Sequence, residues 1–359
     1  MHPHVCCSDR GKVLKKFLFY ISQDYSFAIL RPLQEILLAR GDEVSWFFEG
    51  NKVTKSYLTQ NENLIHTVAD IFNYHPDVVV APSNSIPNFL PGLKVAVFHG
   101  FDAGKLDNKG NNDHFKIRGC FDLYCTQGPN TTGKFKELQQ KHGHFNVIET
   151  GWSTFDKLFT SKLDTKNNKQ PTIFLGSTFS KRLTQAKYIF PQVKQLCETM
   201  DWKWIVSLHP KSDPSVIELY RSIENKNLSY VATDDLIPIL QEADIMVGDT
   251  SSALTMFIIQ NKPAVTVKNI DAKPYLLNIT DANDLKSAIE KALSYPLELM
   301  QEISHYNAQT HPYIDGNSSN RVIKAIDDVL ANKYPLKKSK PLNIIKNLKF
   351  RKRLNYWRI

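Results

Sequence analysis

The sequence predicts an α/β protein made of two parallel-sheet domains and a basic C-terminal tail. Its 359 residues are too many for a single hydrophobic core of ordinary size and suffice for two domains of roughly 150 to 180 residues each. Short β-branched runs alternate with helical stretches, as in a parallel sheet covered by helices, and this alternation occurs twice. A polar, lysine-rich stretch at residues 160–170 separates the two series and is typical of an interdomain linker.

The composition is that of a globular protein. Hydrophobic residues make up 42% and charged residues 23% of the chain, which excludes a disordered, collagenous or disulfide-scaffold protein. The five cysteines form no CxxC pair, so we expect reduced thiols. No apolar stretch approaches the roughly 18 to 20 residues that span a bilayer, and the N-terminal segment lacks the apolar region of a signal peptide. We therefore expect a cytoplasmic protein.

The first half begins with a β-α-β unit at the spacing of a Rossmann-like domain. A strand is expected at residues 16–21 (KFLFYI), a helix at 27–39 and a second strand at 43–48 (EVSWFF). The rest of this half is expected to contain a helix at 64–72 and strands at 77–81, 94–98, 123–126 and 146–149.

The same alternation starts again after the linker. Strands are expected at 171–176, 204–208, 228–232, 245–247 and 264–267, and helices at 184–200, 235–242, 251–260, 281–293 and 318–330. Two Rossmann-like halves of similar length, closed by a long helix, are the layout of a GT-B enzyme. We therefore expect an acceptor-side domain at 1–160 and a nucleotide-donor domain at 171–331, facing each other across a cleft, with a tail at 332–359. Ligands of open α/β sheets bind at the carboxyl ends of the strands.

Two histidines directly follow predicted strands. His99 comes after the strand at 94–98, and its pKa range suits a general base that takes a proton from an acceptor hydroxyl. His209 comes after the strand at 204–208, where it can hold a diphosphate oxygen or protonate a leaving phosphate. The structural alternatives remain open: a capping or buried histidine at 99, and a turn histidine at 209.

Two hydroxyl-rich turns also follow predicted strands. The segment GDTSS (248–252) precedes a helix, so unpaired backbone N–H groups and hydroxyls would converge on a phosphate; ordinary N-capping by Asp249 or Ser251 is the alternative. The segment GSTFS (176–180) is the second turn, with a plain loop as its alternative. The candidate donor-binding residues are Thr178, Arg182, Asp249, Thr250, Ser251 and Ser252.

Several cofactor motifs are missing from the sequence. There is no GxGxxG segment, which argues against nicotinamide or flavin use, and no DxD segment of the kind that clamps a metal in GT-A transferases. The segment GFDAGK (100–105) has the wrong spacing for a P-loop. We therefore predict neither a cofactor nor a metal site.

The net charge of +9 is concentrated in the tail. Residues 332–359 contain ten basic residues and no acidic one, so the rest of the chain has a net charge of −1. Leu342, Ile345, Leu348, Leu354 and Trp357 recur at mostly helical spacing. Basic residues with interleaved apolar and aromatic ones favour a helix on an anionic membrane surface over a nucleic-acid partner. A solvated C-terminus is the alternative.

Five motifs together resemble one enzyme family. FHG (98–100), GSTFSKRLT (176–184), HP (209–210), GDTSS (248–252) and YIDGNSSNR (313–321) resemble the CDP-glycerol glycerophosphotransferase family, the teichoic-acid-type polyol-phosphate transferases. The resemblance runs from about Val95 to Arg321 and includes DHFKIRGCFDLYCTQGP (113–129). It departs from the family at Phe98, Ser177 and Gly248, where tryptophan, proline and serine are usual.

The resemblance implies an enzyme of cell-envelope polysaccharide biosynthesis. Such an enzyme would move glycerol phosphate from CDP-glycerol, or another polyol phosphate from a related CDP-polyol, to a hydroxyl of an envelope glycan or lipid-linked acceptor, releasing CMP. His99 would be the base, His209 would contact the diphosphate, and Ser251 and Ser252 would hold phosphates. Together with the basic tail, this resemblance predicts a peripheral protein on the inner face of the cell membrane. The alternatives are a GT-B glycosyltransferase with a nucleotide-sugar donor and a non-catalytic binding protein.

Overall fold

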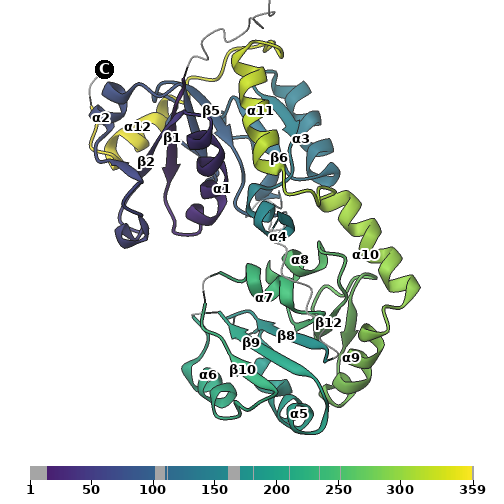
Figure 1. Ribbon diagram of the computed structural model, residues 1–359. Helices are drawn as coiled ribbons and strands as arrows, with labels where there is room; N and C mark the ends of the chain where they lie inside the picture. The colour runs from purple at the N-terminus through teal and green to yellow at the C-terminus, as the bar shows by residue number, and fades with distance from the viewer. Residues whose placement is uncertain are drawn as a thin grey trace, which may run out of the picture. The chain divides into compact units, whose positions relative to one another are not determined.

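The structure is a computed structural model that describes residues 14–101, 110, 112–160, 170–180, 182–209, 211–233, 235–250 and 252–357. Within these residues the chain forms two compact α/β units (Figure 1). Unit 1 contains the described residues up to Gln127, Thr131–Thr154 and those from Asn317 onward. Unit 2 contains Gly128–Asn130 and Phe155–Gly316.

The sheet of unit 1 is parallel and has the strand order of a Rossmann-like domain. Its strands in the described residues lie in the order β3-β2-β1-β4-β5-β6-β7, so the order reverses between β1 and β4. They are β1 (Lys16–Ile21), β2 (Glu43–Phe48), β3 (Asn63–Ile65), β4 (Val78–Ala81), β5 (Leu93–Ala96), β6 (Leu123–Thr126) and β7 (Asn146–Glu149).

Both faces of this sheet are buried. Strand β1 is apolar at successive positions, and successive side chains of a strand point to opposite faces. On one face, Trp46 contacts both Phe19 of β1 and Phe27 of α1 (Ser26–Ala39), and α11 (Ser318–Leu330) packs beside α1. On the other face, Leu18 and Tyr20 share a core with α2 (Val68–Tyr74) and α3 (Pro129–His142).

Unit 2 repeats the same topology. Its strands in the described residues lie in the order β10-β9-β8-β11-β12-β13, again all parallel and reversing between β8 and β11. They are β8 (Thr172–Ser177), β9 (Lys203–Leu208), β10 (Leu228–Tyr230), β11 (Ile245–Gly248), β12 (Ala264–Val267) and β13 (Leu277–Ile279). The helices are α4 (Asp156–Thr160), α5 (Ala186–Thr199), α6 (Pro214–Arg221), α7 (Ile237–Glu242), α8 (Ser252–Ile258), α9 (Leu285–Leu293) and α10 (Leu297–Thr310).

The prediction of two Rossmann-like parallel sheets is confirmed, with two local corrections. The helix expected at 64–72 begins only at Val68, because Asn63–Ile65 pairs with β2 and the Thr67 hydroxyl accepts a hydrogen bond from the Asp70 amide as an N-cap. The strand expected at 94–98 ends at Ala96, since Phe98 has φ = 57° and cannot continue a strand.

The division into units differs from the predicted boundaries at 160, 171 and 331. Helix α11 was expected to close the second domain, but it packs against α1 and β6 of unit 1. Asp327 of α11 accepts a hydrogen bond from Arg40 Nη1 at 2.6 Å and lies 3.2 Å from Lys15 Nζ. Buried Val322 and Ile326 complete the contact. Unit 1 is therefore built from two separate parts of the sequence, an N-terminal part and the residues from Asn317 onward.

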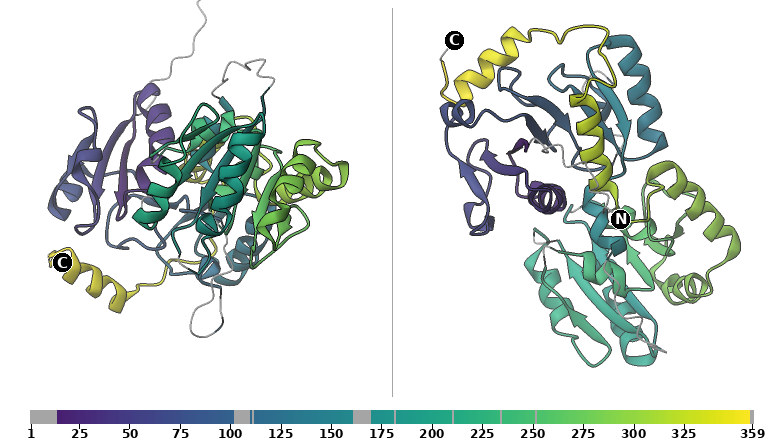
Figure 2. Two further views of the ribbon diagram at one scale, coloured as in Figure 1. Left: turned by 90° about the horizontal axis from the view of Figure 1, so that it is seen from below. Right: turned by 45° about the horizontal axis from the view of Figure 1, so that its top comes forward.

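The described part of the tail also belongs to unit 1. Its helix α12 (Ile344–Arg353) lies beside α2 (Figures 1 and 2). Phe350 is 3% exposed, and the Tyr356 ring stacks on Phe72 of α2 at 5.4 Å between centroids. Arg353 pairs with Glu49, a residue that follows β2 and is 8% exposed. In the described part of the chain, no helix is long and apolar enough to cross a bilayer.

The pair of Arg353 and Glu49 predicts a pH-dependent stability effect. Burial raises the pKa of Glu49, and Arg353 opposes that rise. A carboxyl group whose pKa is raised by folding lowers stability above its unfolded pKa, and this cost disappears as the pH falls below that value. We expect Arg353→Gln to lower the free energy of unfolding by about 1 kcal/mol at neutral pH, because the pair is partly exposed.

At a pH below the unfolded pKa of Glu49 we expect a smaller loss from Arg353→Gln, because the carboxyl group is then protonated in both proteins. Urea denaturation of the variant and the wild type at the two pH values measures the difference. An equal loss at both values would contradict the pairing.

Candidate functional site

His99 lies at the carboxyl end of β5, where the backbone leaves the sheet in an unusual conformation. Phe98 has φ = 57°, a region that costs a bulky residue on the order of 1–3 kcal/mol and that often marks functional sites. Its ring is buried and packs against Phe135 and His114, each at 5.2 Å between centroids. This packing holds the strained turn, and His99 is left exposed to solvent.

The contacts of His99 define which nitrogen can accept a proton. Its Nδ1 lies 3.0 Å from the carbonyl oxygen of Pro82, which can only accept a hydrogen bond. Nδ1 therefore carries the hydrogen in the neutral ring, and Nε2 presents a lone pair. The ring also stacks on Tyr25 at 5.6 Å. A neutral imidazole oriented in this way is arranged as a general base.

His99 and its two contacting residues come from three strand ends. Tyr25 follows β1, Pro82 follows β4 and His99 follows β5, so they meet at the side of the sheet where the strand order reverses. That position is where open α/β sheets bind ligands. The predicted placement of His99 at a strand's carboxyl end is therefore observed.

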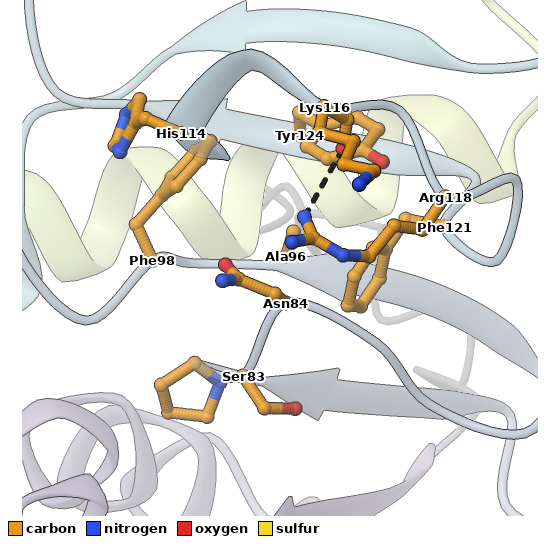
Figure 3. Close-up of a pocket in the computed structure, with 10 residues that line it drawn as sticks. Ser83, Asn84, Ala96, Phe98, His114, Lys116, Arg118, Phe121 and Tyr124 are labelled. Carbon is orange, nitrogen blue, oxygen red and sulfur yellow. Dashed lines mark hydrogen bonds between the residues drawn. The ribbon is translucent and has the colours of Figure 1, made fainter. Parts of the chain in front are cut away.

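A pocket of unit 1 is lined in part by Phe98, the residue before His99, and by Pro82, whose carbonyl oxygen contacts the His99 ring (Figure 3). In the pocket, the Arg118 guanidinium faces the Asn84 amide (Figure 3). Arg118 Nη2 donates to both carboxylate oxygens of Asp113, at 2.7 and 2.9 Å. Asp113 therefore fixes the Arg118 guanidinium at the wall of this pocket, whose volume of about 10 Å³ has room for about one water molecule.

Sequence reasoning did not identify Asn84 or Arg118 as site residues. A signal was present for Arg118, because the segment 113–129 carries part of the family resemblance. No motif points to Asn84, which reaches the pocket only because it follows β4, the strand beside β5.

In unit 2, the ends of β8 and β11 approach each other closely. Gly176 and Gly248 are paired in the parallel register of these strands. A Cβ atom at Gly248 would lie 2.9 Å from the Gly176 carbonyl oxygen, and one at Gly176 would lie 2.7 Å from Cζ of Phe174. At Gly248 the close atom belongs to the backbone, so only glycine fits there, and the strand register makes the two following turns begin side by side.

Asp249 joins these two turns. It is 1% exposed, and its carboxylate accepts hydrogen bonds from the Ser177 hydroxyl and from the backbone amides of Thr178, at 3.0 Å, and Gln185, at 3.2 Å. Burial raises the pKa of Asp249, whereas these hydrogen bonds oppose the rise. Its carboxylate accepts hydrogen bonds from other groups of the protein, and two of these donors lie in or directly after the turn that follows β8. Asp249 therefore positions this turn.

The other predicted donor residues surround this buried carboxylate. Thr178 and Thr250 are half-buried and Arg182 is exposed, all in turns that follow β8 or β11. Ser251 lies outside the described residues, and Ser252 is described only as the first residue of α8. The structure thus brings the two hydroxyl-rich turns together and leaves the roles of their serines as predictions.

His209 lies at the carboxyl end of β9 and has the opposite hydrogen-bond arrangement to His99. Its Nδ1 accepts a hydrogen bond from the Lys211 amide at 3.0 Å, so the neutral ring carries its hydrogen on Nε2 and can donate there. The Phe179 ring, from the turn after β8, packs on the imidazole at 4.4 Å. Lys211 Nζ lies 5.8 Å from the Phe179 ring centre.

This contact places His209 beside the hydroxyl-rich turn of residues 176–180. Phe179 and Lys211 are not predictable as site residues from the sequence, because neither carries a motif by itself. Among the described residues, no three His, Cys, Asp or Glu side chains are grouped so that they could hold a metal ion.

No family model and no curated protein sequence matches the chain. Solved structures do match. The UDP complex of S. aureus MnaA has a TM-score of 0.62 and 15% identity over 91% of this chain and 100% of that chain. The wall teichoic acid polymerase TagF has a TM-score of 0.60 and 12% identity over 89% of this chain and 90% of that chain.

UDP-GlcNAc 2-epimerase from Neisseria meningitidis, bound to UDP-GlcNAc, has a TM-score of 0.59 and 11% identity over 87% of this chain and 100% of that chain. Another structure of TagF comes from a CDPG soak. At these identities the similarity shows the fold alone. The chain therefore has the GT-B fold, which it shares with a teichoic acid polymerase and with nucleotide-sugar epimerases.

Proposed function

We propose that this protein transfers a polyol phosphate of the glycerol-phosphate type from a CDP-activated donor to a hydroxyl group of a cell-envelope glycan or glycolipid, with release of CMP. The complementary hydrogen bonding of the two strand-end histidines carries this proposal. His99 presents an accepting Nε2, and His209 presents a donating Nε2–H. Phosphoryl transfer requires both a proton acceptor for the attacking hydroxyl and a donor for the departing phosphate.

In this reaction His99 Nε2 takes the proton of the acceptor hydroxyl while its oxygen bonds to the phosphorus that carries the polyol. The bond between this phosphorus and the departing CMP oxygen breaks, and its electron pair leaves with CMP. The Nε2–H of His209 donates to the diphosphate and stabilises the charge that develops on CMP. His99 then releases its proton to solvent, so the reaction balances without a cofactor.

The proposed donor grip consists of Thr178, Arg182, Thr250, Ser251 and Ser252. Asp249 positions these residues without contacting the donor, since it accepts a hydrogen bond from the turn that carries Thr178. Lys211 adds a cation next to His209. The similarity to TagF, including a structure from a CDPG soak, supports a CDP-linked donor.

An enzyme acting on a nucleotide sugar is the second candidate. The structures of MnaA with UDP and of an epimerase with UDP-GlcNAc favour it, because they share the fold at similar TM-scores. Such an enzyme would use the same kind of diphosphate grip and would act on a sugar carbon.

Thermal stabilisation by donors and products separates the two candidates. We expect CDP-glycerol or CDP-ribitol, together with CMP, to raise the melting temperature, because binding to the native state at about 100 times Kd adds about 2.7 kcal/mol of stability. UDP-sugars are expected to have no effect. Stabilisation by UDP-sugars alone would overturn the proposal in favour of the nucleotide-sugar candidate.

We also propose that the protein works in the cytoplasm as a peripheral protein on the inner face of the cell membrane, through residues 332–359. The ten basic residues of this segment, and its lack of acidic ones, support an anionic membrane as the partner. No nucleic-acid partner is proposed.

A further inference from the structure

The tail helix α12 has two faces of different character. Phe350 points into the core of unit 1 and is 3% exposed. On the opposite face, Ile344, Ile345 and Leu348 are 62%, 73% and 49% exposed, and their spacing places them on one side of a helix. We call this the outer face of α12. Aliphatic side chains clustered in solvent usually mark a surface that meets another molecule.

The exposed apolar surface continues beyond the helix. Leu342, just before α12, is 79% exposed, and Trp357, just after it, is 57% exposed. A shallow hollow over the outer face is lined by Leu342, Asn343, Ile344, Ile345, Lys346 and Lys349. Apolar side chains and cations are therefore mixed on one surface.

The inner face of α12 is fixed to unit 1 by specific contacts. Asn347 Oδ1 accepts a hydrogen bond from the Asn88 amide at 3.1 Å. Asn343 Nδ2 donates to the Gly119 carbonyl at 2.9 Å, and Lys346 Nζ donates to the Arg118 carbonyl at 3.2 Å. These contacts, with buried Phe350, prevent the outer face from turning inward to cover its own apolar residues.

The charge and the apolar character of the outer face together indicate which kind of partner it binds. Lys349 and Lys352 are exposed beside the aliphatic residues, and residues 332–359 contain no acidic residue. An anionic bilayer complements both features, since headgroups attract the lysines and the acyl region receives the aliphatic side chains. A nucleic acid would account for the lysines and leave the isoleucines and leucines unexplained.

We propose that the outer face of α12, extended by Leu342 and Trp357, docks unit 1 onto an anionic phospholipid bilayer while the inner face stays bound to the protein. The surface is a rigid platform and not a detachable tail. The inner face holds Asn88 and Arg118, and the Arg118 side chain lines the pocket next to His99. Docking therefore fixes this pocket relative to the membrane. The inference rests on the proposed membrane location and is independent of the proposed reaction.

The test uses the full chain and sedimentation with phosphatidylcholine vesicles, with and without phosphatidylserine. We expect the wild type to bind only the phosphatidylserine vesicles. Ile345→Ser with Leu348→Ser should weaken this binding about tenfold or more, and so should Lys349→Glu with Lys352→Glu. All of these side chains are exposed, so the melting temperature should stay unchanged.

Matched controls change equally exposed residues elsewhere. Ile270 and Leu297 are 75% and 73% exposed, and Ile270→Ser with Leu297→Ser should leave vesicle binding intact. Lys136 and Lys187 are exposed as well, and their replacement by glutamate should have a much smaller effect than the same change at Lys349 and Lys352.

Two results would overturn the inference. One is undiminished vesicle binding by the Ile345→Ser, Leu348→Ser variant. The other is a wild-type dimer in solution that this variant dissociates while vesicle binding is unchanged, which would assign the outer face to a second copy of the chain. Stabilisation by CDP-glycerol, measured on the same proteins, tests the proposed reaction separately, so the two proposals can fail independently.

Discussion

Replacing His99 by alanine is expected to slow CMP release about a hundredfold to ten-thousandfold, the usual contribution of a general base. Affinity for the CDP-linked donor should change little, because in the proposed reaction His99 contacts the acceptor hydroxyl and other residues hold the donor. A CMP-release assay gives the rate, and titration calorimetry with CDP-glycerol gives the affinity.

His66→Ala is the matched control. His66 is also an exposed histidine that directly follows a strand of the same sheet, but that strand, β3, is at the sheet edge. Its replacement should leave CMP release unchanged. If His99→Ala and His66→Ala release CMP at the same rate, His99 is not the base, and its bond to Pro82 is only structural.

Replacing Asp249 by alanine is expected to disorder the turn after β8 and to weaken donor binding at least tenfold. The change leaves the part-buried backbone amides of Thr178 and Gln185 without their carboxylate acceptor and removes one hydrogen bond of the Ser177 hydroxyl. A buried donor left unsatisfied costs about 1–3 kcal/mol, so unit 2 should also lose stability. Calorimetry with CDP-glycerol measures the affinity, and hydrogen exchange at the Thr178 and Gln185 amides measures the loosening.

Asp201→Ala removes an exposed carboxylate just before β9, at the other end of the sheet, and serves as the control. It should change neither donor affinity nor exchange at these amides. Slow exchange at Thr178 together with lost affinity in Asp249→Ala would mean that the carboxylate contacts the donor directly, against the positioning role argued above.

The strands of both sheets were the most predictable part of the fold. Parallel strands are buried on both faces, so their sequences are short continuous runs of apolar residues. Residues 16–21, 43–48 and 264–267 were predicted with the bounds that the structure shows. By contrast, α3 (Pro129–His142) was not predicted, because its polar sequence buries only a few residues and lacks a clear apolar stripe.

The positions of the candidate site residues could be predicted from the strand ends, but their hydrogen-bond partners could not. Knowing where β5, β8, β9 and β11 end is enough to place His99, His209 and the two hydroxyl-rich turns. Which ring nitrogen carries the hydrogen depends on Pro82 and Lys211, through hydrogen bonds that no local pattern reveals. The inward-facing carboxylate of Asp249 likewise depends on Ser177, which is 72 residues away in the chain.

The sequence by itself determined the fold class, the two series of parallel strands and, to within two residues, the strand ends that precede the histidines, because apolar runs and turn residues are local patterns. Only the tertiary structure decided that α11 and α12 belong to unit 1. It also decided that Phe350 of the tail faces inward while Ile345 faces solvent. The reason is physical: helical periodicity shows that apolar residues recur, but which of them are buried depends on the surface against which the helix packs.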